Sequence, residues 1–509
     1  MFETEYIEEP NLLFGNRKEE KDPRVGITYH GPYHYSSEEG PSPNQIKVGI
    51  IGDSVSLTLT KRFLEALKQP INSFSANKWL YPNYSGLNKD GPVKCGIDTS
   101  KTWEATIRSD EITHVINIVD VNKRIAEAAN LFKEKLNTIV IEDNKPDVVI
   151  CSLPKQIEDF CGISRRTRGA KRPKFTDAEK LHAEFENTGQ KFLSQWGLGL
   201  EPEDKEEETD RGMDLHNAIK GRTMESGIPV QILRQSTTDE FLKNLSSRNE
   251  MSQEPSTFAW NFAMALYYKA NGKPWRLAKL DQDTCYVGIS FFHNLMNPNL
   301  DVQTSMAQVF TIDGEGLVVR GKDVVKDRVT KQVHIPKAQA EKLMIDALNT
   351  YRKRSGREPA KIVIHKTTLF SDDEIEGFSK AIGQLSKDFV TLNPNHPYRF
   401  ARSGQYPILR GTMIEITPNM CLLFTSGYTP RLRTYPGHRI PKPLMVTHYG
   451  DSEMLTVCKD ILSLTKLDWN TTAFSTYTPI TLSFSKKVGK VLSELPENSK
   501  LQNHYRFYM

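Results

Sequence analysis

The stretch IKVGIIGDS, residues 46–54, is a continuous apolar run that Gly52 and Asp53 bring to an end. The stretch LTLTKRFLEALK, residues 57–68, follows it, and its apolar residues have helical spacing. An apolar run, a tight turn and an amphipathic helix in this order predict a buried strand that leads into a helix. The chain therefore begins an α/β unit near residue 46.

The same alternation recurs further along the chain. THVINIVDV, residues 113–121, is predicted to be a strand, RIAEAANLFKEKLNTIV, residues 124–140, a helix, and PDVVICSLP, residues 146–154, a second strand. Strands that alternate with helices are typical of a parallel sheet with crossover helices. The first unit is thus predicted to be Rossmann-like, but without a GxGxxG motif it gives little support to a dinucleotide site.

A second α/β unit begins with TCYVGISFF, residues 284–292. It continues with SMAQVFTIDGEGLVVRG, residues 305–321, a predicted hairpin with its turn at Asp313-Gly314. A helix over residues 335–354 and a strand and helix over residues 360–382 follow. Strand, hairpin, helix and strand in this order predict an RNase H-like fold, so the fold class is α/β throughout.

These patterns divide the chain into three parts: an irregular arm over residues 1–45, a first domain over 46–275 and a second domain over 276–509. Residues 162–212 interrupt the first domain with the basic run RRTRGAKRPK and the acidic run EPEDKEEETD. Such charge runs are typical of a solvated surface insertion, although a nucleic-acid or partner contact is an alternative.

The composition is that of a globular protein, with 38% hydrophobic and 26% charged residues in 509. The net charge of +4 says little about a polyanionic partner, so local clusters have to carry that argument. All cysteines stand alone, and no apolar run is long enough to cross a membrane. We therefore expect a cytoplasmic protein without a membrane partner.

Four polar residues could form a phosphate site. His216 and Lys220 are four residues apart on a predicted helix, so they share a face, while Gln231 lies on the next strand and Lys269 beyond it. Taken singly, a lysine on a helix is more often solvated and a glutamine on a strand more often structural. Together they would place an imidazole, two ammonium groups and an amide around one phosphate.

The order and spacing of these residues resemble the MID-domain motif of Argonaute proteins. The resemblance implies that Lys220, Gln231 and Lys269 bind the 5′-phosphate of a guide strand and that His216 stacks on its first base. Many members have one more lysine where this chain has Ala265. A magnesium ion (Mg2+), held partly by the C-terminal carboxylate of Met509, is the implied substitute.

The second domain resembles the PIWI domain of the same family. Family members that cut have an aspartate where this chain has Ser290, and another where HKTT, residues 365–368, has Thr367. RGKDVVKD, residues 320–327, contains no glutamate where the mobile catalytic glutamate of the family is expected, and the fourth metal-ligand position falls near Lys486. Because two-metal hydrolysis needs clustered carboxylates, the chain is predicted not to be an enzyme. A displaced active site would have to use nearby acids: Asp281, Asp283, Asp301, Asp313 and Glu315.

Two segments mix basic and aromatic residues as nucleic-acid grooves do: NPNHPYRFARSGQYP, residues 393–407, and RLRTYPGHRIPKP, residues 431–443. The candidate contacts to the nucleic-acid backbone are Arg399, Arg402, Arg431 and Arg433. The alternative is that these segments are ordinary loops.

The whole resemblance is to short prokaryotic Argonautes with MID and PIWI domains, and within them to the SPARTA group. It implies a guide RNA, a single-stranded target DNA and a partner TIR–APAZ protein that forms a heterodimer with this chain and oligomerises on target binding. The partner would then hydrolyse NAD+ or NADP+, causing abortive infection as antiviral defence. Alternatives are a guided PIWI nuclease, or the same sensor with a SIR2 or nuclease effector.

Overall fold

The structure is a computed structural model of the chain. It describes residues 3–33, 42–140, 144–161, 213–245, 254–279, 283–293, 303–310, 316–321, 324–326, 333–436, 440–495 and 499–509. The insertion predicted over residues 162–212 lies outside these ranges, and so does the predicted turn at Asp313-Gly314.

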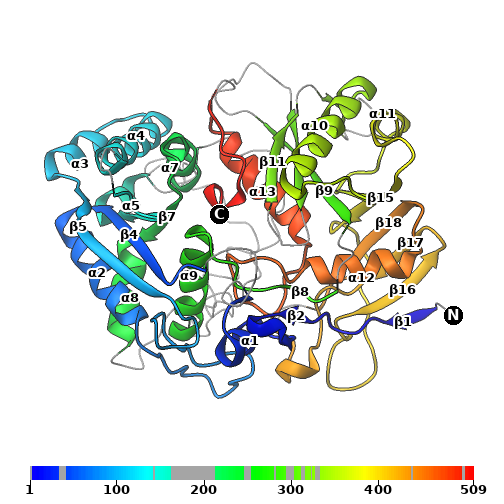
Figure 1. The fold of residues 1–509 in the computed structure, drawn as a ribbon, viewed down its shortest axis with the longest axis horizontal. Coiled ribbons are helices and arrows are strands. Elements are labelled where there is room, and N and C mark those ends of the chain that lie inside the picture. Colours follow the sequence, from blue (N-terminus) through cyan, green and yellow to red (C-terminus); the bar gives the residue numbers. More distant parts are fainter. Residues whose placement is uncertain are drawn as a thin grey trace, which may run out of the picture.

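The first half of the chain forms a four-stranded parallel sheet in the order β5-β4-β6-β7, drawn on the left of Figure 1. Its strands are β4 (Gln45–Gly52), β5 (Gly96–Thr106), β6 (Val148–Leu153) and β7 (Val230–Arg234). The helices of this half are α2 (Ser54–Leu67), α3 (Ser109–Ile116), α4 (Val121–Val140), α5 (Lys155–Cys161), α7 (Leu215–Thr223), α8 (Gln235–Asn244) and α9 (Pro255–Lys269). The predicted α/β fold with parallel strands is confirmed here.

The first turn of this sheet forms as the sequence indicates. The apolar side chains of β4 are buried, and the strand ends at Gly52. The Asp53 carboxylate then accepts a hydrogen bond from the main-chain N–H of Ser56 (2.8 Å) and so caps α2.

One predicted strand is wrong. Residues 113–121 were expected to be a strand, but Ser109–Ile116 form α3 and the following turn leads into α4. Ile112 and Val115 are three residues apart and both buried, which is the spacing of a helix face. The second strand is β5 instead, whose polar stretch Thr99–Thr102 hides the alternation of its buried residues Ile97, Trp103 and Ala105.

The second half is built on a nine-stranded sheet in the order β1-β16-β17-β18-β15-β14-β9-β10-β11. Its strands from this half are β9 (Thr284–His293), β10 (Gln303–Phe310), β11 (Gly316–Arg320), β14 (Lys361–Lys366), β15 (Ser386–Asn393), β16 (Thr412–Thr417), β17 (Met420–Leu423) and β18 (Leu444–Gly450). β14 pairs in parallel with β9 and β15, whereas β9, β10 and β11 form an antiparallel meander. This is the strand arrangement expected of an RNase H-like fold.

Helices cover both faces of the large sheet: α10 (Lys337–Ser355), α11 (Asp372–Ile382), α12 (Met454–Leu464) and α13 (Ile480–Leu492). Val287 and Ile289 of β9 share a core with α10 and α11, while Tyr286 and Phe292 point to the opposite face and share a core with α12 and α13. None of the helices in the described part of the chain combines the length and the apolar composition that crossing a bilayer requires.

The N-terminal arm is more ordered than expected. It contains β1 (Thr4–Tyr6), β2 (Leu12–Leu13), η1 (Gly15–Arg17), β3 (Glu19–Glu20) and α1 (Pro23–His30). β1 pairs with β16 at the edge of the nine-stranded sheet, and β2 pairs with β3 and with β8 (Arg276–Leu277). The remaining short elements are η4 (Met224–Ser226), β12 (Val325–Lys326), β13 (Val333–His334), η5 (Pro430–Leu432) and η6 (Tyr505–Phe507).

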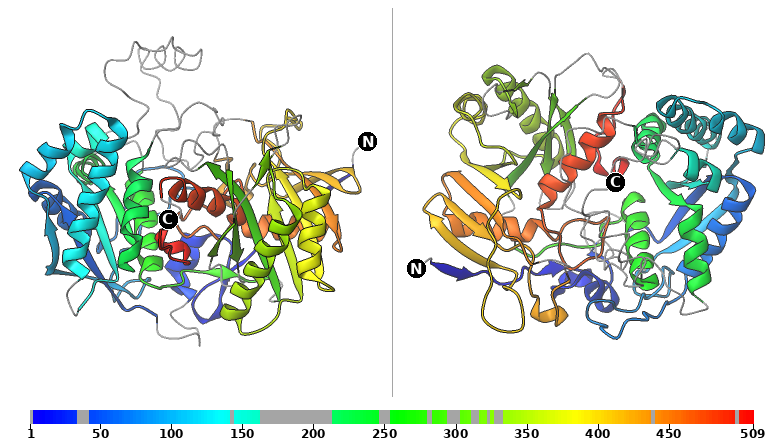
Figure 2. Two further views of the ribbon diagram at one scale, coloured as in Figure 1. Left: turned by 90° about the horizontal axis from the view of Figure 1, so that it is seen from above. Right: turned by 180° about the vertical axis from the view of Figure 1, so that it is seen from behind.

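The two halves share one apolar core. The rings of Tyr268 in α9 and Trp469 are 4.7 Å apart, and the indole N–H of Trp275 donates to the main-chain oxygen of Lys466 (2.8 Å). The C-terminus lies between the two halves in all three views (Figures 1 and 2). Residues near the end of the chain can therefore contact elements of both sheets.

A buried ionic network fixes the arm to the second half. The Glu9 carboxylate lies 2.8 Å from both the Arg410 Nε and the Lys466 Nζ atoms, and both cationic side chains are almost completely buried. Burial by itself would raise the pKa of Glu9, but Arg410 and Lys466 outweigh it and hold that pKa below its ordinary value.

We predict that Glu9→Gln lowers the free energy of unfolding by about 3 kcal/mol, because it leaves two buried cations without their carboxylate. The loss should be fully present above the ordinary glutamate pKa of 4.5 and shrink as the pH falls through the lowered pKa of Glu9. Urea denaturation at several pH values measures it. The matched control is Glu8→Gln, since Glu8 is exposed; an equal loss in both variants would contradict the account.

Candidate nucleic-acid interface

Two lysines are buried between the halves of the molecule. Lys220 lies on α7 and Lys269 is the last residue of α9, and their exposed fractions are 4% and 1%. The Lys269 Nζ atom lies 2.5 Å from the Gln231 Oε1 atom of β7. The Lys220 Nζ atom donates to the main-chain oxygen of Tyr508, 3.2 Å away. The structure thus brings together Lys220, Gln231 and Lys269 from three different elements.

Local interactions hold α7 in the position that buries Lys220. Asp214 caps the helix by accepting from the main-chain N–H of His216 (2.8 Å), and the Glu494 carboxylate accepts from the N–H of Asp214 (2.9 Å). A Cβ atom at Gly221 would lie 2.8 Å from a methyl carbon of Leu495, so a residue without a side chain lets the helix pack this closely. His216 is exposed on the same helix.

The electrostatics of the pair are unfavourable without a ligand. Burial lowers the pKa of Lys269 to about 7 and that of Lys220 well below its ordinary value, and Lys269 and Lys487 add to the effect on Lys220. Within the part of the chain that the structure describes, neither ammonium group forms an ion pair with a carboxylate. An anion that accepts from both groups would satisfy this arrangement, and a phosphate has the required charge and oxygen atoms.

Two further groups belong to this site and were not foreseen. Lys487 of α13 brings another cation near Lys220, and its Nζ atom lies 3.3 Å from the Asp468 carboxylate. The other is the Tyr508 carbonyl, which accepts from Lys220. In the sequence, the neighbouring lysines of SFSKKVGK were the only signal, and the helical period turns Lys487 about 100° from Lys486.

The side chains of this pocket suit an anion better than a divalent cation. Mg2+ prefers carboxylate and carbonyl oxygens, whereas the Gln231 amide oxygen and the Tyr508 carbonyl both accept from lysines. Among the described residues, no cluster of three or more His, Cys, Asp or Glu side chains could hold a metal ion. Met509 is buried at the end of the chain, next to Tyr508.

The second candidate region is the face of β9 that contacts α13. A Cβ atom at Gly288 would collide with the main-chain oxygen of Thr481, and one at Gly489 would lie 3.4 Å from Phe292 Cβ. Ser290 lies between Gly288 and Phe292 on the same face, because alternate residues of a strand point the same way. Its side chain is buried, and its Oγ atom has no hydrogen-bond partner among the described residues.

The same contacts identify the helix residue opposite Ser290. The strand segment from Gly288 to Phe292 and the helix segment from Thr481 to Gly489 both span about 12–13 Å. Their ends lie against each other, so the residue halfway along the helix segment lies opposite Ser290, which is halfway along the strand segment. That residue is Ser485, which is buried, whereas Lys486 is exposed. The structure therefore brings Ser485, rather than the expected Lys486, to this face.

Thr367 follows the last residue of β14 and is half-buried. His365 of β14 pairs with Gly288 of β9, so Thr367 lies two residues beyond this pair on one strand and Ser290 two residues beyond it on the other. The buried His365 ring lies 2.8 Å from the Thr481 hydroxyl, and burial lowers the pKa of His365 to about 3, so it is neutral. Hydroxyl groups and a neutral imidazole thus gather in this region of β9, β14 and α13, and such groups hold Mg2+ weakly.

The acids considered for a displaced active site are only partly described. Asp283 pairs with Arg357 at 2.9 Å. The other four, Asp281, Asp301, Asp313 and Glu315, lie outside the described residues.

The four candidate arginines differ in their contacts. Arg399 and Arg402 are exposed and donate to main-chain carbonyls, so their charge remains available. Arg431 forms an ion pair with Glu20 (2.8 Å), and the Arg433 guanidinium lies 4.9 Å from the centre of the Trp79 ring. The latter two thus also connect the second half to the arm and to the first half.

Comparisons with known proteins relate this architecture to the Argonaute and PIWI proteins. No family model matches the chain. A protein named "Protein argonaute" from Cereibacter sphaeroides is 22% identical over 388 residues, which are 69% of this chain and 45% of that protein. The chain thus spans less than half the length of this curated relative.

Solved structures match the whole fold. The Argonaute of Clostridium butyricum, bound to a guide DNA and a 19-mer target DNA, matches with a TM-score of 0.60 and 17% identity over 100% of this chain and 55% of that one. Drosophila Piwi matches with a TM-score of 0.58 and 12% identity over 99% and 56%. The chain therefore has the α/β fold of the MID–PIWI half of Argonaute structures.

We predict that Lys269→Met raises the free energy of unfolding of the ligand-free chain by about 1–3 kcal/mol at pH 6–7, because it removes a buried charge without a carboxylate partner. From pH 7 to 10 the unfolded chain holds a proton at Lys269 that the folded chain has lost, so wild-type stability rises with pH at this site and the gain shrinks. Denaturation at pH 6, 8 and 10 measures the trend, with exposed Lys459→Met as control. A loss of stability at pH 6 would contradict the account.

Proposed function

We propose that this chain is the guide-binding and target-sensing subunit of a prokaryotic Argonaute defence complex. The observation that carries the proposal is the pair of buried ammonium groups, Lys220 and Lys269. Lys269 contacts Gln231, and neither lysine has a carboxylate partner among the described residues. The 5′-phosphate of a guide RNA would supply the missing negative charge. The comparisons support a guide-binding protein, since the matched Clostridium butyricum Argonaute is bound to guide and target DNA.

The exposed His216 lies on the same helix as Lys220 and is suited to stack on the first base of the guide. Arg399 and Arg402, and to a lesser extent Arg431 and Arg433, would contact the nucleic-acid backbone. Base pairing would supply sequence specificity, while the protein reads the shape and charge of the guide–target duplex. The target in this proposal is single-stranded DNA.

Mg2+ is part of the proposal, although the described side chains do not provide a site for it. Its ligands would be the guide phosphate and the carboxylate of Met509. The ion would add the positive charge that a lysine supplies in relatives with a basic residue at the position of Ala265.

We further propose that the PIWI half binds its target without cutting it. Ser290 and Ser485 lie where β9 meets α13, and Thr367 follows β14. None of these side chains is a carboxylate of the kind that two-metal hydrolysis needs, and Lys486 is exposed. The resemblance to the SPARTA group then assigns the enzymatic step to a partner, a TIR–APAZ protein that would hydrolyse NAD+ or NADP+ in the cytoplasm after target recognition. NAD(P)+ depletion would end the infection by arresting the cell.

We predict that Lys220→Glu and Lys269→Met each weaken binding of a 5′-phosphorylated RNA guide by 10- to 100-fold, since each removes a charge-assisted hydrogen bond to the phosphate. Filter binding with a 5′-phosphate and a 5′-hydroxyl guide measures the effect. Lys459→Met should bind like wild type. If the hydroxyl guide binds as tightly as the phosphorylated guide, the phosphate pocket is wrong.

We predict that the guide-loaded chain leaves a complementary single-stranded DNA intact in Mg2+ or Mn2+, and that NAD+ disappears only when the TIR–APAZ partner and the target are both present. Gel analysis of the DNA and a fluorescent NAD+ assay measure these outcomes. Cleaved DNA would favour the alternative of a guided PIWI nuclease. Target-dependent activation of a partner with a SIR2 or nuclease domain would retain the sensor and replace the effector.

A further inference from the structure

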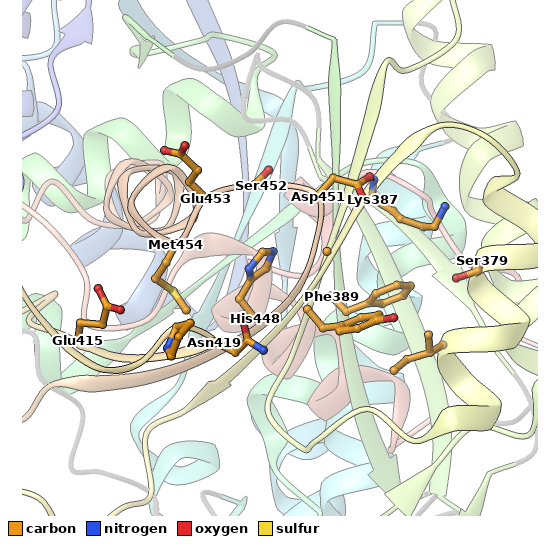
Figure 3. Close-up of a pocket in the computed structure, with 14 residues that line it drawn as sticks. Ser379, Lys387, Phe389, Glu415, Asn419, His448, Asp451, Ser452, Glu453 and Met454 are labelled. Carbon is orange, nitrogen blue, oxygen red and sulfur yellow. The ribbon is translucent and has the colours of Figure 1, made fainter.

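A hollow of about 630 Å³ lies in the second half of the molecule, away from the lysine pocket. It is lined by residues of α11, β15, β16 and β18 and by the start of α12 (Figure 3). Figure 1 shows these strands on the side of the large sheet that faces away from the four-stranded sheet. Its occupant therefore has to be a molecule other than the guide end.

The rim of the hollow is acidic. Glu415, Asp451 and Glu453 line it, and Glu453 and Asp451 are exposed (Figure 3). Among the described residues no ion pair engages the carboxylates of Glu415 and Glu453. The single lysine of the lining, Lys387, directs its Nζ atom to the main-chain oxygen of Gly383 at 3.2 Å.

A buried network beneath the lining is already balanced. The ring of His448 lies 2.8 Å from the Asp388 carboxylate, which also pairs with Lys361 at 2.8 Å and accepts from Ser452. These contacts hold the pKa of Asp388 below its ordinary range although burial would raise it. Asp388 is therefore already paired, so the negative charge that faces solvent is that of the rim carboxylates.

The wall of the hollow offers an aromatic face. Tyr449 is 62% exposed and stacks on Phe389 with ring centres 6.3 Å apart, and Met454 lies across from them. An exposed tyrosine ring beside unpaired carboxylates suits a guanidinium group, which stacks on aromatic faces and pairs with carboxylates through its planar fork. Nucleic-acid phosphates would be repelled by the same carboxylates.

Glu415 connects the hollow to the edge of the sheet, because it lies on β16, the strand next to β1. The main-chain N–H of Glu415 donates to the oxygen of Glu3 (3.0 Å), just before β1, and β1 is the outermost strand of the nine-stranded sheet. All three residues of β1 are exposed, and Glu3, Glu5 and Glu8 add negative charge around it. Unpaired strand edges accept extended segments of other proteins.

We propose that this hollow is a docking site for an arginine side chain presented by a basic segment of a partner protein. The proposal does not depend on guide binding, because it rests on the aromatic wall, the unpaired carboxylates of Glu415 and Glu453 and the neighbouring edge of β1. It defines the kind of partner by charge and shape.

The test measures binding of a fluorescein-labelled octapeptide of alternating glycine and arginine to the full chain by fluorescence polarisation. A peptide with citrulline in place of arginine keeps the shape and removes the charge, and we expect it to bind at least 10-fold more weakly. The double variant Glu415→Gln/Glu453→Gln should weaken arginine-peptide binding at least 10-fold, and Tyr449→Ser at least threefold.

A double variant of two exposed acids in the four-stranded half, Asp90→Asn/Glu134→Gln, is the matched control and should change binding less than twofold. Binding of the phosphorylated guide should be the same in all variants, which separates this proposal from the guide pocket. Equal affinity of the arginine and citrulline peptides, or of wild type and the Glu415/Glu453 variant, would overturn the proposal. So would loss of binding of an eight-nucleotide single strand in that variant, because the site would then serve nucleic acid.

Discussion

The burial of two ammonium groups without a carboxylate partner is the constraint that explains the centre of this molecule. Lys220 and Lys269 are surrounded by protein where the two sheets meet, and burial disfavours their charged forms. A fold that needed only stability would place apolar side chains there, since these are often at least as stable as buried charges. The arrangement is reasonable for a site whose missing partner is an anionic ligand.

Helix α13 connects this site to the rest of the second half. One end of the helix packs against Gly288 of β9 through Thr481, and its other end leads to Glu494 and Leu495, which hold α7 in place. Lys487 projects from the same helix toward Lys220. A ligand bound by the lysines would therefore contact the same helix that packs against the face of Ser290.

Much of the fold could be predicted from the sequence, because a long buried strand is visible as a continuous apolar run. β4, β6, β9 and β14 were each foreseen from continuous apolar runs. β5 was missed because polar residues interrupt its alternation, and residues 113–121 were taken for a strand because a short apolar run fits both periods. The sequence did not indicate that the arm contributes strand β1 to the large sheet, since the pairing of β1 with β16 joins segments some 400 residues apart.

Those residues of the candidate site that follow a spaced sequence motif could be predicted from the sequence. Lys220, Gln231 and Lys269 were chosen for their spacing, and in the structure Lys269 contacts Gln231 while Lys220 is buried near Lys269. Lys487 and the Tyr508 carbonyl reach the same pocket from the other half of the chain, and no local pattern links them to it. Ser485 and Lys486 are neighbours on α13, and sequence similarity alone did not show which of them faces β9. The structure does, because Ser485 is buried and Lys486 is exposed.

The central claim is that the buried lysines receive their charge together with the guide phosphate, and calorimetry tests it most directly. A 5′-phosphorylated RNA guide is titrated into the protein at pH 7.5 in two buffers of different ionisation enthalpy. Because the pKa of Lys269 is about 7 in the free protein, about three quarters of this side chain is neutral at pH 7.5. The account therefore predicts an uptake of at least this fraction of a proton per bound guide, and none for a 5′-hydroxyl guide. The same heat in both buffers for the phosphorylated guide would contradict it.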